Sequence, residues 1–171
     1  DNYSIVIYDA EGTQVAAMTY AQVSDNNDMI TLPAGSYTLV ARSLAGEVPA
    51  ASWENPIYGT TKEFTIRAGE TTALGELVCT LVQCKVTVSY SDDFLASVTG
   101  EGKTSVEVTA GYPLDYQLSA NGTYDQSAGF FAVNGNTMKV EFKGIINGKT
   151  AKMTKTFTGI APKQWRQVRF V

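Results

Sequence analysis

Residues 71–90 read TTALGELVCTLVQCKVTVSY, and this strand-forming stretch decides how the rest of the chain is interpreted. A single β-strand usually has about 5 to 6 residues, so the stretch is too long for one strand. Leu77, Cys79 and Leu81 are apolar at odd positions, whereas from Val82 onward the apolar residues occupy even positions. Successive side chains of a strand point to opposite faces, so one strand cannot serve both halves. We therefore predict two strands that meet near residue 81.

On either side of this stretch, apolar and polar residues alternate with a period of two through most of the chain. No window sustains the apolar i, i+3, i+4, i+7 stripe of a helix over three turns. The predicted fold class is therefore all-β. We expect two consecutive antiparallel β-sandwich domains, at residues 1–81 and 82–171, which suits a chain of 171 residues.

In the N-terminal half, the alternation marks several strands. Residues 4–8 and 14–19 flank an acidic turn with glycine and predict a hairpin. Residues 36–44 follow a Pro-Ala-Gly turn, and residues 61–67 resume the pattern. Residues 45–60 contain glycine and prolines and lack periodicity, which predicts a long connection.

In the C-terminal half, the clearest amphipathic strand spans residues 138–143, where apolar residues alternate with charged ones. Asn-Gly pairs at 121, 134 and 147 are typical of hairpin turns. Asp92-Asp93-Phe94 predicts a short helical turn, and residues 164–171 predict a closing strand.

Charge and composition exclude several function classes. Thirteen basic and 17 acidic residues leave a net charge of −4, which argues against a polyanionic partner and predicts no nucleic-acid binding. Basic residues gather toward the C-terminus, where their alternation is typical of a solvated strand face. The most apolar short run, residues 77–82, is far shorter than a membrane-spanning helix requires.

Catalytic signatures are missing from the sequence. It contains no histidine, which excludes imidazole-based triads and histidine-bearing zinc sites. No phosphate-binding loop and no nucleophile elbow is present, because the Gly-Lys-Thr at 148–150 follows its first glycine too closely. We predict that the protein is not an enzyme and that it has no cofactor and no metal site.

Loop carboxylates and two cysteines are the remaining groups with chemistry. The carboxylates could act as calcium ligands or as an acid and base pair, but they lack calcium-loop spacing and are interpreted as turn formers: Asp25, Asp28, Asp92, Asp93 and Asp125. Cys79 and Cys84 lie five positions apart in extended chain, where they would be too distant to pair. We expect both to be buried small residues; a looped disulfide and a reactive thiol are the alternatives.

Three aromatic residues are the candidate ligand or partner contacts: Trp53, Tyr58 and Trp165. Large amphipathic rings in or beside loops can stack on sugars or fill a pocket of a partner. The alternative for Trp53 and Tyr58 is a plug over the open end of a sandwich. The segment 165–171 can add to the sheet edge of another subunit, or it can be the last strand of its own domain.

The segment ITLPAGSYTLVA at 30–41 resembles the strand-turn-strand signature of transthyretin-like and fimbrillin-like sandwiches. Together with WENPIYG at 53–59, CTLVQCKVTVSY at 79–90 and the Asp-Asp-Phe that follows, it resembles an uncharacterised family of Bacteroides surface lipoproteins. The similarity spans nearly the whole chain. This family is similar in architecture to the fimbrillins and related adhesin subunits.

The resemblance implies a non-catalytic cell-surface adhesin or a fimbria-like structural component of a Bacteroidetes bacterium. It implies export as an outer-membrane lipoprotein, with the lipid-anchor cysteine upstream of residue 1 and no other membrane contact. The expected partners are host or microbial surface proteins or glycans, and other pilus subunits through strand pairing. The alternative, based on the three aromatic residues, is a carbohydrate-binding accessory module for polysaccharide capture.

Overall fold

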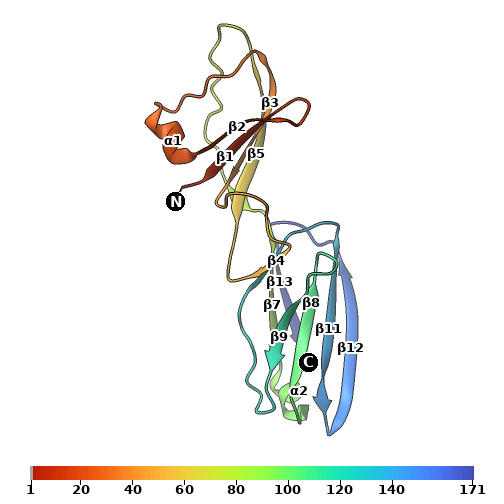
Figure 1. Ribbon diagram of the computed structural model, residues 1–171. Coiled ribbons are helices and arrows are strands. Elements are labelled where there is room, and N and C mark those ends of the chain that lie inside the picture. Colours follow the sequence, from red (N-terminus) through yellow and green to blue (C-terminus); the bar gives the residue numbers. More distant parts are fainter. Residues whose placement is uncertain (1) are drawn as a thin grey trace. The chain divides into compact units, whose positions relative to one another are not determined.

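The computed structural model describes residues 2–171, and the chain divides into two compact units. The N-terminal unit runs to Val48 and resumes at Ile57–Val82, and the C-terminal unit consists of Pro49–Pro56 and Gln83–Val171. Figure 1 labels the elements of each. Three sheets, antiparallel except for one strand pair, account for nearly all regular structure, which confirms the all-β prediction. None of the described helices has the length and apolar character needed to cross a bilayer.

A single antiparallel sheet, in the order β2-β1-β3-β5-β6, forms the N-terminal unit. Its strands are β1 (Ser4–Asp9), β2 (Gln14–Thr19), β3 (Gly35–Arg42), β5 (Tyr58–Ile66) and β6 (Thr80–Leu81). The sandwich predicted here is therefore wrong for this unit. In place of a second sheet, helix α1 (Tyr20–Asp25) and the irregular segments 28–32 and 71–79 pack on the inner face.

The predicted strand at 71–81 shrinks to the two residues of β6. Gly75 adopts a positive φ of 68°, a left-handed conformation that interrupts an extended backbone. Leu77 and Cys79 still pack toward the core, so the apolar alternation reports burial of this segment without strand pairing. Sequence reasoning also missed α1, which begins with a capping box between Thr19 and Gln22.

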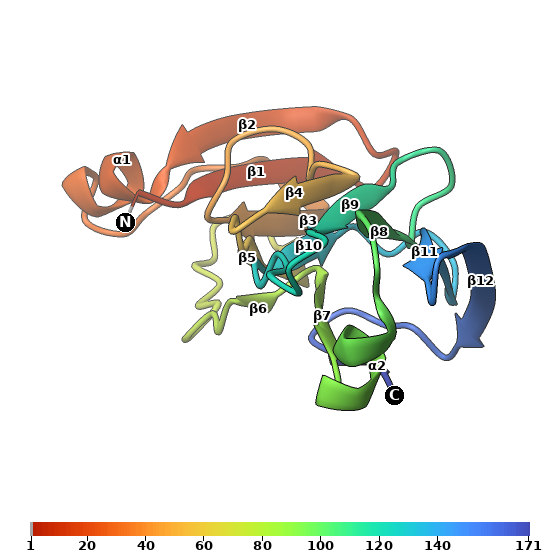
Figure 2. The same cartoon turned by 90° about the horizontal axis from the view of Figure 1, so that it is seen from below.

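Two four-stranded sheets form the C-terminal unit, in the orders β13-β7-β10-β4 and β12-β11-β8-β9. The first contains β13 (Trp165–Phe170), β7 (Cys84–Tyr90), β10 (Gly129–Phe131) and β4 (Ala51–Trp53), and the second β12 (Lys149–Thr158), β11 (Thr137–Ile146), β8 (Gly102–Glu107) and β9 (Leu114–Leu118). Strand β4 lies within residues 45–60, where the sequence predicted only a connection. It pairs with β10 and so covers an edge that would otherwise be open. Helix α2 (Asp92–Ser97), which confirms the predicted helical turn, lies beside the chain's C-terminal end (Figures 1 and 2).

Buried tyrosines join the two sheets of the C-terminal unit. The Tyr116 hydroxyl on β9 donates to the Val86 carbonyl at 2.8 Å and accepts from the Gly129 amide at 3.1 Å. In the opposite direction, the Tyr90 hydroxyl on β7 hydrogen-bonds Thr104 on β8 at 2.7 Å. Both hydroxyls are thereby satisfied inside a core whose aromatic cluster includes Tyr90, Phe94, Phe142 and Phe170.

Candidate binding surfaces

A cavity of about 890 Å³ lies in the N-terminal unit, between the sheet and its cover, which consists of helix α1 and the segments 28–32 and 71–79. Apolar side chains dominate the wall, with Ile5, Ile7, Leu39 and Phe64 on the sheet and Leu74 and Leu77 on the segment. Its volume falls in the range of about 300 to 1,000 Å³ that is typical of ligand sites in proteins. Helix α1 and irregular segments, rather than a second sheet, cover this face and leave the cavity.

Strand β5 has an open edge beside the same segment. It pairs with β3 along its full length, but on its other side β6 covers only Tyr58 and Gly59. Tyr58 exchanges hydrogen bonds with Ser43 on the β3 side, so Thr61, Glu63 and Thr65 direct their backbone groups to the open edge. Within residues 2–171, the contacts that hold the segment to β5 there come from side chains.

Two side-chain hydrogen bonds make these contacts. The Lys62 ammonium donates to the Leu74 carbonyl at 2.7 Å, and the Thr72 hydroxyl donates to the Thr65 carbonyl at 2.9 Å. A backbone ladder would place a bond at every second residue, so this attachment is sparse. Sequence reasoning missed this edge because the strand expected at 71–81 would have covered it.

The predicted aromatic contacts do not form one site. Trp53 lies on β4, where its ring meets Tyr116 edge to face at 4.7 Å between centroids, and it is 37% exposed. Gly129, its partner across β10, also faces the core, so Trp53 points to the inner side of the sheet. Tyr58 belongs to the N-terminal unit and starts β5, with its ring 41% exposed.

Trp165 has the opposite orientation on the same sheet as Trp53. It begins β13 on the outer face and is 57% exposed. Its indole N–H donates to the Thr87 hydroxyl at 3.0 Å, and the Lys85 ammonium lies 4.7 Å from the ring centroid. Strand β13 is the last strand of its own domain, since it pairs with β7 in parallel and buries Val168.

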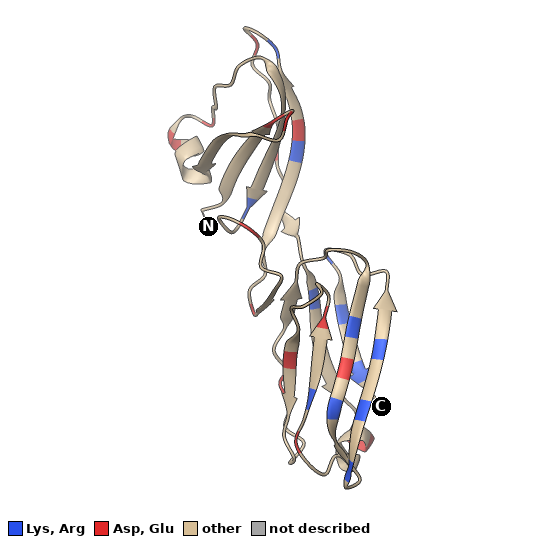
Figure 3. Ribbon diagram, turned by 45° about the vertical axis from the view of Figure 1, so that its right-hand side comes forward, with Lys and Arg blue, Asp and Glu red and all other residues tan. Residues whose placement is uncertain are grey.

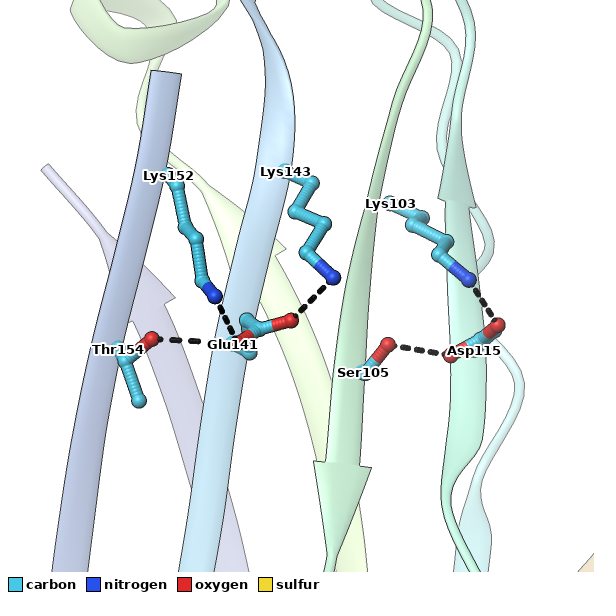
Figure 4. A network of polar contacts seen from close by, with 7 residues as sticks. All are labelled: Lys103, Ser105, Asp115, Glu141, Lys143, Lys152 and Thr154. Carbon is cyan, nitrogen blue, oxygen red and sulfur yellow. Dashed lines mark hydrogen bonds and ion pairs between the residues drawn. The ribbon is translucent and has the colours of Figure 1, made fainter.

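The outer face of the other sheet carries a network of charged and hydroxyl groups (Figure 4). Glu141 accepts from Lys143 at 2.6 Å and from Lys152 at 3.1 Å, and these two contacts lower the pKa of its carboxyl to about 2. Partial burial alone would raise the pKa of Asp115, but its contacts with Lys103 and Ser105 lower it overall. Every acid in this network has a cationic partner, as expected of a solvated strand face.

Within residues 2–171, no three histidine, cysteine, aspartate or glutamate side chains gather closely enough to hold an ion. Both cysteines are free thiols. Burial raises the pKa of the Cys84 thiol to about 11, and burial also raises that of Cys79, which lines the cavity. A raised pKa keeps a thiol protonated at neutral pH and therefore weakly nucleophilic.

Charge is unevenly divided between the two units. The N-terminal unit has three basic and nine acidic residues, and the C-terminal unit has ten basic and eight acidic residues. Figure 3 shows the lysines and arginines of the C-terminal unit along its strands. The net charge of −4 for the whole chain therefore conceals a C-terminal unit with a positive balance.

These features define an all-β protein with three sheets in two compact units. The chain belongs to the DUF4493 family, a domain of unknown function, whose model matches residues 1–171. No curated protein matches the sequence.

Distant similarity to three solved structures accompanies this family match. A provisionally assigned cell adhesion protein of Bacteroides fragilis is 13% identical, with a TM-score of 0.37 over 98% of this chain and 78% of that one. The TIE protein of Bacillus anthracis is 13% identical with a TM-score of 0.35, and the match covers 98% of this chain and 30% of that protein. The major pilin of Streptococcus pyogenes is 12% identical, with a TM-score of 0.22 over 100% of this chain and 90% of that one.

Proposed function

We propose that this protein is a non-catalytic cell-surface component of a Bacteroidetes bacterium, an adhesin or fimbria-like structural subunit. In this proposal it is exported as an outer-membrane lipoprotein, with an anchor upstream of residue 1, and its C-terminal unit is a fimbrillin-like sandwich. The sequence resemblance supports the proposed cell-surface location and the proposed class, an adhesin or fimbria-like subunit. The observation that carries the proposal is the open edge of β5 beside an apolar cavity, which suits addition of a strand from another subunit.

Strand addition uses both features of this surface. An incoming strand would pair with the backbone groups of Thr61, Glu63 and Thr65. Its alternate side chains would lie on the inner side of the sheet, where Phe64 and Ile66 line the cavity. Backbone pairing supplies affinity and the cavity supplies preference for apolar residues at every second position.

The segment 71–79 regulates access to the edge in this proposal. An added strand would replace the Thr72 hydroxyl at the Thr65 carbonyl, and the Lys62 bond to Leu74 would have to open or adjust. Lys62 is also a charged residue on the inner face of an edge strand, a known device against unwanted pairing. Replacing Lys62 with a neutral residue should therefore favour addition of a strand at the open edge of β5.

Sedimentation velocity over a series of micromolar concentrations tests this function. Glu63→Pro removes one edge amide, and Glu63→Ala keeps it while changing the same side chain. We expect the wild type and Glu63→Ala to associate, Glu63→Pro to remain monomeric, and Lys62→Met to associate more strongly. Circular dichroism checks that the variants fold. A wild type that stays monomeric throughout, or association that survives Glu63→Pro, would contradict strand addition at this edge.

The enzyme alternative has its own test. The purified chain should not turn over glycan or peptide substrates, and any turnover lost on replacing Asp92 and Asp93 would refute the non-catalytic proposal.

The second candidate function, polysaccharide capture by a carbohydrate-binding module, is favoured by one observation, the solvent-facing ring of Trp165.

A further inference from the structure

The outer face of β13 and β7 carries an aromatic ring beside basic and hydroxyl groups. Parallel pairing sets Trp165 beside Lys85, Gln167 beside Thr87 and Arg169 beside Ser89. In each pair both side chains point away from the core, because the intervening Val168 and Val86 are buried. These six residues form the Trp165 face.

The Trp165 ring is held in place before any ligand arrives. Its N–H bond to Thr87 fixes the edge of the indole, and the Lys85 ammonium contacts the ring as a cation. More than half of the side chain nevertheless remains accessible. A fixed and accessible ring loses little conformational entropy when it stacks on a ligand, which favours binding.

Charge on the Trp165 face has one sign. Lys85 and Arg169 are its ionisable residues, and the other four are neutral. Trp165 and Arg169 are four residues apart, so the face extends for roughly 13 Å along the strand at ~3.3 Å per residue. Gln167, Thr87 and Ser89 lie between these ends and offer amide and hydroxyl groups for hydrogen bonds.

We propose that the Trp165 face binds an acidic polysaccharide. One sugar ring stacks on Trp165, and carboxylate or sulfate groups contact Lys85 and Arg169. Hydroxyl groups of the sugar bond to Gln167 and the two neighbouring hydroxyls. This proposal is independent of strand addition at β5, and it explains how a chain with a negative net charge can present a local surface for an anion.

Titration calorimetry with polygalacturonate, its methyl ester and chondroitin sulfate tests the Trp165 face. We expect binding to polygalacturonate, to chondroitin sulfate or to both, and not to the neutral ester. Polygalacturonate carries carboxylates only and chondroitin sulfate carries carboxylates and sulfates, so binding to chondroitin sulfate alone would indicate sulfate recognition. Affinity should fall with increasing salt, because exposed charges are screened.

Variants assign the binding to this face. Trp165→Ala should weaken binding at least about tenfold, as expected for a central aromatic contact. Lys85→Gln combined with Arg169→Gln should weaken it by a similar factor and flatten the salt dependence. Trp53→Phe is the matched control and should bind like the wild type. In that variant Trp165 is the only tryptophan, so its fluorescence should change on titration with the acidic polymer.

Three results would overturn the proposal: no binding to either acidic polymer, unchanged binding by Trp165→Ala, or equal binding of polygalacturonate and its ester. The second of these results, together with loss of binding in the charge variant, would identify simple ion exchange. Thermal unfolding of each variant shows whether the C-terminal unit is intact. Sedimentation data on Glu63→Pro are unaffected by any of these outcomes.

Discussion

The two units of this chain use similar strands to build surfaces of different kinds. The C-terminal unit closes two sheets over one core, and tyrosine hydroxyls bond across that core. The N-terminal unit has one sheet, an irregular cover and a cavity of about 890 Å³. A closed core resists change, whereas a sparsely held cover can open at low cost. We infer that the C-terminal unit is the rigid platform and the N-terminal unit the adaptable one.

Thiol labelling of the native protein should give the largest contrast between the units. Cys79 lines the cavity and is partly exposed, so we expect it to react with a maleimide under native conditions. Cys84 is fully buried and reacts only when the C-terminal unit opens, which should slow it roughly thousandfold or more. Peptide mapping by mass spectrometry assigns the two rates. Comparable rates would refute the rigid-platform inference.

Large-to-small substitutions should sharpen the contrast in packing. Phe142→Ala removes a fully buried ring from the aromatic cluster and should cost about 3 to 5 kcal/mol of unfolding free energy. Phe64→Ala enlarges an existing cavity and should cost about 2 kcal/mol or less. Both tryptophans lie in the C-terminal unit, so tryptophan fluorescence during denaturation reports that unit, while circular dichroism reports both. Equal losses of unfolding free energy in the two variants would contradict the proposed difference in packing between the units.

Loss of one hydroxyl tests the bonds between the sheets. Tyr116→Phe leaves the Gly129 amide and the Val86 carbonyl without their buried partner, and should cost about 2 to 3 kcal/mol. Tyr112→Phe is the control at an exposed ring and should change stability by less than about 0.5 kcal/mol. Guanidinium denaturation followed by tryptophan fluorescence measures both. A neutral Tyr116→Phe would show that packing alone joins the sheets.

Local alternation predicted most strands of both units, because a half-buried strand leaves a period of two in the sequence. The segment 71–79 shows the same alternation without becoming a strand, since Gly75 turns left-handed and pairing depends on distant partners. The candidate sites were less predictable for the same reason. Trp165 was predicted as a candidate contact, but its neighbours Lys85 and Thr87 lie about eighty positions earlier and meet it only through parallel pairing.

The smallest expected effect concerns the polar outer face of the C-terminal unit. Lys143 and Lys152 hold the folded-state pKa of Glu141 near 2, below the ordinary value of 4.5. A lowered pKa stabilises the fold above pH 4.5, and this contribution is lost as the pH falls from 4.5 toward 2. We therefore expect Glu141→Gln to lower the denaturation midpoint slightly at pH 7, with the difference from the wild type shrinking through that window. Exposed ion pairs contribute little, so the shift should be smaller than that of Tyr116→Phe. A difference that stays constant from pH 7 to pH 2 would mean that Glu141 acts through packing rather than charge.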